Sequence, residues 1–422
     1  MNISDSTLLS RLRALPRPAW ILFLGTFLNK FGTFVMPFLT LYLTHRGFSL
    51  SAVGLAISAY GLGGLMASGL GGHLADAIGR RKTIALSMFS VAAAMMLLSQ
   101  SANLPLIIAA TWLAALTGEL YRPAASALLA DLVPPDLRIT AYAAYRMSFN
   151  AGFAFGPATA GFLAAHGYFW LFAGDAASSV IFGLIALAAL PRDVPIRREQ
   201  SHWTDDFRAL ARDGKFLRVL CGAFVIALVF LQISSTFSLE VTRLGFPPAT
   251  YGLVLSLNGF LVVLCELPLT TVTRRLPSRL VMGVGYLLIG AGFSLNAFAH
   301  SAAGLVTCVV IFTLGEMVSM PVSTAYIAGL APAHLRGRYM GTYALTWSAA
   351  LIIAPQIGLR VFGQSPEILW IGCGALAVVA AAIILPRSLH GGDDVLNPAR
   401  SQAVEATSLQ KMVPASSEVG PE

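Results

Sequence analysis

The sequence predicts an all-α integral membrane protein whose twelve transmembrane helices form two pseudo-symmetric six-helix bundles. One observation is the composition: of 422 residues, 56% are hydrophobic and 11% are charged, whereas soluble proteins carry about 25% charged residues. The mean hydropathy is +0.73. The other observation is an internal repeat at an offset of 198 positions, by which Gly47 and Pro134 return as Gly245 and Pro332. A register held over such a length indicates two structurally equivalent halves.

Apolar stretches of about 20 residues, the length that crosses a bilayer, recur along the whole chain. Six lie in each half, near 17–44, 51–75, 82–100, 105–130, 139–165, 168–190, 217–240, 249–272, 279–299, 303–331, 338–362 and 366–386. They divide the chain into an N-terminal segment (1–16), a first bundle (17–190), a linker (191–216), a second bundle (217–386) and a tail (387–422).

Lysine and arginine are unevenly distributed between the loops of the two sides. The loops of one side carry basic clusters within 11–17, 80–82, 192–218, 274–279 and 336–338. The loops of the other side carry only Arg46, Arg243 and Arg360. Because cytoplasmic loops retain positive charge, we expect a multi-pass protein with both termini in the cytoplasm. The same loops explain the net charge of +8, so no nucleic acid partner is expected.

The segments outside the two bundles are polar. The first 16 residues are too polar for a signal peptide, and the tail has the Ser, Pro, Gly and Glu content of a disordered segment. In the linker, Trp203, Phe207 and Leu210 follow helical spacing, which predicts an interfacial helix on the membrane surface. A solvated linker is the alternative. The cysteines show no C-x-x-C spacing, so neither a disulfide framework nor a metal or other cofactor is expected.

The loop after the second span combines a tight turn with charged residues. It reads GHLADAIGRRK over 72–82, where glycine permits the turn and the carboxylate can pair with a basic residue or a helix N-terminus. This pattern resembles the signature loop of the major facilitator superfamily. The resemblance implies a conformational latch that closes the cytoplasmic side, formed by Gly72, Asp76, Gly79, Arg80 and Arg81. An ordinary positively charged turn is the alternative.

Such a resemblance implies a secondary active transporter that works by alternating access in the bacterial cytoplasmic (inner) membrane, not an enzyme. Its partners would be a small-molecule substrate, protons and membrane lipid, and the chain would act as a monomer. The sequence also lacks the phosphate-binding pattern Gly-x-x-x-x-Gly-Lys-Ser/Thr, which argues against ATP as the source of energy.

The fifth span carries a helix-packing motif, in which Gly156 follows Gly152 by four positions and Gly161 follows Pro157 by four. Small residues at this spacing let two helices approach closely, and proline introduces a kink. The motif resembles the antiporter motif of drug-exporting facilitators, and the eleventh span repeats part of it around Ala354. Generic helix packing without directional meaning is the alternative.

Ionisable residues inside apolar helices are usually functional or paired. In this chain they are Lys30, Glu119, Arg122, Arg146, Asp175, Glu266 and Glu316. Glu119 and Arg122 lie three positions apart, so they share a helix face and can form an internal pair. Asp175 lies about seven residues into the sixth span, from where it can reach the interface between the halves.

Glu316 has no basic residue within a helical turn, and Glu266 likewise has no partner in its own span. The stretch from Gly315 to Pro321, with the following loop, resembles bacterial multidrug facilitators of the lactococcal and MdtH type. In these proteins the acidic residue of the tenth span serves in proton or cation coupling. We therefore take Glu316 as the leading proton-coupling candidate, followed by Glu266, Asp175 and Glu119. The alternative is that Glu316 pairs with Lys30 or Arg146 across the cavity.

A substrate cavity between the halves would be lined by polar, aromatic and flexible side chains suited to varied compounds. The candidates are Lys30, Arg122, Arg146, Phe34, Gln232, Asn258, Met317 and Tyr326. We expect proton-coupled efflux, by antiport, of small amphipathic or cationic compounds. The alternatives are proton-coupled uptake of a small polar nutrient or an organic anion, and lipid handling.

Overall fold

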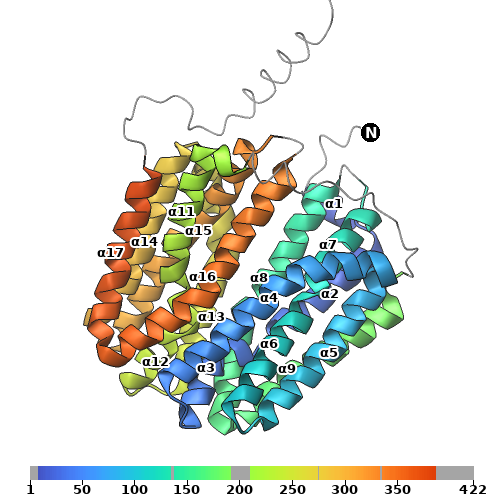
Figure 1. Cartoon of the computed structure of the whole chain (residues 1–422). Coiled ribbons are helices and arrows are strands. Elements are labelled where there is room, and N and C mark those ends of the chain that lie inside the picture. Colours follow the sequence, from blue (N-terminus) through green and yellow to red (C-terminus); the bar gives the residue numbers. More distant parts are fainter. Residues whose placement is uncertain (1–7, 135–136, 192–209, 274, 333–334, 386–422) are drawn as a thin grey trace, which may run out of the picture.

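The computed structural model describes residues 8–134, 137–191, 210–273, 275–332 and 335–385. Most of the linker, with the predicted interfacial helix, and the tail from 387 to 422 lie outside these residues. Within them the chain is built from helices (Figure 1).

The first half contains α1 (Leu8–Arg13), α2 (Arg17–Phe31), α3 (Val35–His45), α4 (Leu50–Ile78), α5 (Arg80–Gln100), α6 (Leu104–Glu119), α7 (Tyr121–Leu132), α8 (Arg138–His166) and α9 (Phe169–Ala189). The second half contains α11 (Gly214–Phe230), the short 3₁₀ helix η3 (Leu231–Ser234), α12 (Thr236–Arg243), α13 (Pro248–Thr273), α14 (Ser278–Ser294), the 3₁₀ helix η4 (Leu295–Phe298), α15 (Ala302–Leu330), α16 (Arg336–Gln364) and α17 (Pro366–Ile384).

The predicted membrane-spanning architecture is confirmed. In the described part of the chain, 11 helical spans are long and apolar enough to cross a membrane. Helix α8 is the remaining predicted span, and its 29 residues equal the length of α4. Small residues of α8, among them Gly152, Gly156 and Gly161, pack against α2 and α13.

Three spans are broken into two helices. In the first and fourth spans the break lies shortly before a proline, at 32–34 ahead of Pro37 and at Leu120 ahead of Pro123. Proline has no amide hydrogen and disrupts the turn before it, so a helix restarts more easily with proline in its first turn. The seventh span is interrupted by η3, where the hydroxyl of Ser235 donates to the backbone oxygen of Leu231. Side-chain bonds of this kind compete with the helical ladder.

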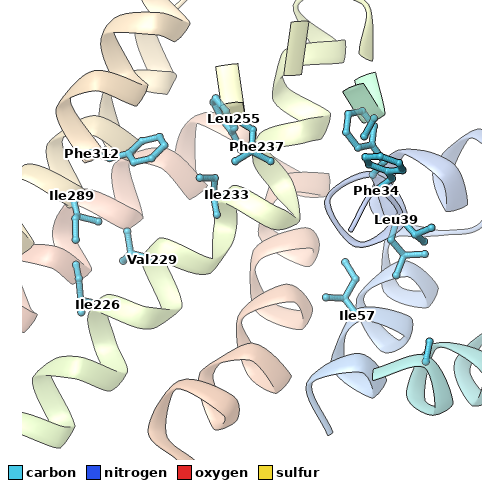
Figure 2. Packing of buried hydrophobic residues seen from close by; sticks show 14 of the residues in the cluster. Phe34, Leu39, Ile57, Ile226, Val229, Ile233, Phe237, Leu255, Ile289 and Phe312 are labelled. Atoms are coloured by element: carbon cyan, nitrogen blue, oxygen red, sulfur yellow. The ribbon is translucent and has the colours of Figure 1, made fainter. Parts of the chain in front are cut away.

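The two halves repeat each other in detail. Gly47 and Gly245, which follow the first and seventh spans, both adopt positive φ angles, 82° and 85°, that favour glycine. Buried apolar side chains of both halves form one connected core, with Phe38 of the first half against Tyr251 of the second. In the second half, Ile226 and Val229 of α11 point toward Ile289 of α14 and Phe312 of α15 (Figure 2).

The halves meet along two pairs of antiparallel helices, α4 with α16 and α8 with α13. On the first pair, the hydroxyl of Ser58 donates to the backbone oxygen of Ile352 at 2.5 Å. On the second, the hydroxyl of Ser256 accepts a hydrogen bond from the backbone N–H of Ala158 at 2.8 Å. Ser58 and Ser256 are equivalent in the internal repeat, so an equivalent hydroxyl bonds to the backbone of the other half on both sides of the interface, as a donor in one pair and as an acceptor in the other.

Figure 1 shows α1 at one end of the molecule and α3 with α12 at the other, and we call these the α1 end and the α12 end. At the α12 end, α3 packs against α12, which joins the two halves. Close contact between α4 and α16 extends as far as Gly61 and Ile352. Two turns further toward the α1 end, Ser68 and Leu345 are both exposed. The halves are therefore packed together at the α12 end and separate between α4 and α16 at the α1 end.

Candidate functional site

A three-residue ion cluster lies inside the first half, at the break between α6 and α7. Glu119 is the last residue of α6, and its Oε1 lies 3.5 Å from the Nζ of Lys30 on α2. Its Oε2 accepts a hydrogen bond from the Nη1 of Arg122 at 2.9 Å, so the predicted pair of Glu119 and Arg122 is confirmed. One carboxylate is thus shared by two cations.

Aromatic rings surround this cluster. The Nζ of Lys30 lies 4.9 Å from the ring centroid of Phe149 on α8, and the Cζ of Arg122 lies 5.4 Å from the same centroid. Lys30 also lies 5.6 Å from the ring of Tyr121. Cations are attracted to aromatic faces at such distances. The helix break, the cluster and Phe149 together form one polar and aromatic site.

Glu316 on α15 is the counterpart in the second half. Its Oε2 accepts a hydrogen bond at 2.7 Å from the Nδ2 of Asn258 on α13, which also donates to the hydroxyl of Thr313 at 3.0 Å. Among the residues that the structure describes, Glu316 forms no ion pair. The alternative pairing with Lys30 or Arg146 does not occur in this structure, since Lys30 pairs with Glu119 and Arg146 pairs with Glu266.

The pair of Arg146 and Glu266 crosses between the halves, from α8 to α13. The side chain of Arg146 is 56% exposed and that of Glu266 is 16% exposed, so the pair lies at an edge of the interface. Along α8 and α13, the pair lies nearer to the α1 end than the contact between Ala154 and Gly259 does. The partner that Glu266 lacks in its own span is supplied by the other half.

Asp175 on α9 does not reach the interface between the halves. Its carboxylate is buried and accepts a hydrogen bond from the backbone N–H of Val35 at 3.4 Å. Val35 is the first residue of α3, so the carboxylate stabilises a helix start that has unpaired N–H groups. Phe34, the residue before Val35, is buried next to Gly174, the residue before Asp175. Asp175 and Phe34 therefore both pack at the break between α2 and α3 in the first span.

Two further cavity candidates are buried in helix packing. The amide of Gln232 donates to the backbone oxygens of Leu228 and Ala354 and accepts from Thr236. Met317 is only 1% exposed. The expectation that these two side chains, like Phe34, line an open cavity is therefore wrong for this structure. Tyr326 is half-buried on α15, and Asn258 reaches the site through its bond to Glu316.

The predicted latch loop consists of one residue between two helices. Gly79 has a φ of 95° and separates the end of α4 from the start of α5. Arg80 is buried, with its Nε 3.3 Å from a carboxylate oxygen of Asp131 and its Nη2 3.8 Å from Asp76. Arg81 donates to the backbone oxygen of Leu187 near the end of α9. Sequence reasoning missed Asp131, an acidic residue at the end of the fourth span.

We expect Asp76→Asn and Arg80→Ala to leave the protein folded and inserted but to slow transport. Both changes weaken an ion network at the turn rather than contacts to the substrate. Arg80→Ala should lower the thermal midpoint more than Asp76→Asn, because it leaves both Asp76 and Asp131 without their cation. Thermal unfolding and initial transport rates measure these effects. Wild-type rates in both variants would exclude the latch role.

The helix-packing motif of α8 faces two partners. A methyl group added at Gly152 or Gly156 would lie within 3.0 Å of the backbone of α2, at 2.7 Å from Phe27 O and 2.6 Å from Phe31 O. At Gly161 it would lie 2.9 Å from Ala249 of α13. The motif therefore packs α8 against its own half through two glycines and against the other half through the third.

This arrangement, two equivalent membrane-spanning halves that carry charged side chains within their spans, is that of a secondary transporter. The family model of the Major Facilitator Superfamily matches residues 22–355 and, in a second match, residues 241–409. The chain belongs to this family, and it is a transporter rather than an enzyme.

Relatives of the chain are identical to it at about a quarter of the aligned positions. It is 26% identical to the uncharacterised MFS-type transporter YhjO of Bacillus subtilis, over 57% of this chain and 60% of YhjO. It is 24% identical to a Na(+), Li(+), K(+)/H(+) antiporter of Planococcus maritimus, over 62% of this chain and 67% of that protein. It is also 24% identical to the multidrug resistance protein MdtH of Edwardsiella ictaluri, over 64% and 69%.

Solved structures share the fold. The nucleoside transporter NupG superposes with a TM-score of 0.77 at 15% identity, covering 87% of this chain and 99% of NupG. A peptide transporter POT in complex with alafosfalin superposes with a TM-score of 0.74 at 16% identity, covering 90% and 98%.

Proposed function

We propose that the chain exports small amphipathic compounds, cationic ones included, in exchange for protons. The observation that carries this proposal is Glu316, a carboxylate inside the second half that forms no ion pair among the described residues. A carboxyl group in an apolar surrounding can take up and release a proton as the site changes its exposure. Two relatives are named as a multidrug resistance protein and a cation/proton antiporter, which supports the same class of transport.

The direct test uses purified protein in liposomes with an imposed pH step. A thermal-stability screen across drugs, sugars, amino acids and organic anions first selects a ligand, because a bound compound raises apparent stability with its concentration. Exchange requires that the selected compound moves against its own gradient when protons flow the other way. Movement of compound and protons in the same direction would instead establish uptake by symport.

Uptake of an organic anion is the second candidate. The observation that favours it is Arg122, whose side chain is 55% exposed although it lies within a membrane span. Lipid handling is a further alternative within the family, and inverted vesicles loaded with a lipid or a soluble dye separate it from transport of soluble compounds.

Reporter fusions should place both termini and the segment 191–216 in the cytoplasm of a bacterial cell. The physical reason is the concentration of lysine and arginine in the loops of that side. Alkaline phosphatase, which is active only outside the cytoplasm, and green fluorescent protein, which is active inside it, provide the paired measurement. A phosphatase signal at either terminus would contradict the orientation.

A further inference from the structure

The ion cluster of the first half has a net charge of +1 when all three of its side chains are ionised. Lys30 and Arg122 are both cations, and Glu119 is the carboxylate that both of them contact. Asp175, the other acidic residue of this region, is directed at the backbone of α3 and forms no ion pair in the part of the chain that the structure describes. A charge inside a membrane span is unfavourable unless it meets a counter-charge or water.

Arg122 is the most exposed residue of this cluster. A guanidinium group has five N–H donors, and in the described chain Arg122 makes one hydrogen bond, from Nη1 to Glu119. Its side chain is 55% exposed, whereas Lys30 behind it is 9% exposed. The remaining donors of the planar group match two oxygens of a carboxylate, sulfonate or phosphate.

The surroundings of Arg122 add an apolar surface. Phe149, whose ring lies 5.4 Å from the guanidinium carbon, stands on α8 between Arg146 and Ala154. Arg146 and Ala154 both contact α13 of the other half. The exposed edge of Arg122 is therefore close to the line where the halves meet. It lies toward the α1 end, where α4 and α16 separate.

We infer that Arg122, backed by Lys30 and flanked by Phe149, is an anion-binding subsite that takes the carboxylate, sulfonate or phosphate group of an amphipathic organic compound. The anion would complete the charge balance of the cluster, and the apolar part would pack against the ring of Phe149. The inference rests on the proposed function, and within it on the organic-anion candidate, only in that the compound bound here is the one transported.

The test measures thermal unfolding of the purified full-length protein with three probes of one shape, phenylbutyrate, phenylbutyramide and phenylbutylamine. We expect phenylbutyrate to raise the midpoint with the logarithm of its concentration, and the neutral amide and the amine to raise it much less. Arg122→Gln should raise the dissociation constant of phenylbutyrate about tenfold or more, since it removes a charged hydrogen-bond donor. Arg360→Gln, an exposed arginine at the far end of α16, is the matched control and should leave binding unchanged.

Glu119→Gln should change the affinity for phenylbutyrate in the opposite direction to Arg122→Gln. It therefore separates an effect on binding from an effect on folding. It removes the carboxylate that competes for Arg122, so the variant should bind phenylbutyrate more tightly than the wild type even though its own midpoint is lower. Equal stabilisation by phenylbutyrate and phenylbutyramide, or unchanged binding in Arg122→Gln, would overturn the subsite. Because the assay involves no pH gradient, loss of proton exchange with intact anion binding would overturn the proposed function alone.

Discussion

Glu316→Gln should abolish accumulation of substrate driven by a pH gradient. The substitution keeps the shape of the protonated acid and an oxygen that Asn258 can still reach, but it removes the titrating group. Binding of a neutral or cationic compound would weaken at most, and downhill movement of substrate should lose its dependence on pH. The measurement is substrate uptake into liposomes after an imposed pH step, with the wild type and the variant compared at equal protein density.

Glu119→Gln is the matched control, because it makes the same change in an equivalent span. Glu119 is held by Lys30 and Arg122, so its loss should mainly lower stability. Full pH-driven accumulation by Glu316→Gln would exclude Glu316 as the proton-coupling residue. Glu266 or Asp175 would then be the candidate for that role. Equal loss in both variants would mean that the two carboxylates act together.

Gly259→Ala should strongly slow transport, because its added methyl group has no space between the halves. The new carbon would lie 2.6 Å from the Cα of Ala154 on α8, which is backbone and cannot turn aside. Overpacking of this kind costs about 1–3 kcal/mol. Applied to the state in which α8 and α13 touch, that energy shifts the ratio of the two conformations roughly 5- to 150-fold. The initial rate of exchange across liposomes measures the effect.

Gly69→Ala on α4 is the control, since a methyl group at that position meets nothing within 4 Å. Alanine is the better helix former, so this variant should transport normally and unfold at the same temperature or slightly higher. A wild-type rate in Gly259→Ala would show that the halves do not pass through the close contact seen here.

The course of the helices followed from the sequence because hydrophobicity sets the length of a span directly. The span predicted at 51–75 is Leu50–Ile78, and that at 217–240 is Gly214–Arg243 when its 3₁₀ turn is included. The breaks were harder to predict. Pro37 and Pro123 each indicate where a helix restarts, but the interruption at η3 depends on hydroxyl and amide side chains whose bonds appear only in the folded chain.

The site was predictable where its residues are neighbours in sequence. Glu119 and Arg122 share a helix face at three positions apart, so their pair is a local property. The pair of Arg146 and Glu266 joins residues 120 positions apart, and only the packing of α8 against α13 brings them together. Likewise, the burial of Gln232 and Met317 depends on which face of each helix is turned inward, and helices that are apolar on all sides do not reveal this.

The ion pair between Arg146 and Glu266 fastens the interface on one side only. At the equivalent positions of the other interface the internal repeat places Ser68 and Ala344, which carry no charge. Attraction between an exposed guanidinium and a carboxylate is screened by dissolved salt, whereas the contact of apolar helices is not. Ionic strength should therefore affect one of the two interfaces and not the other. High salt should weaken the contact of α8 with α13 near the α1 end and leave the α12 end closed.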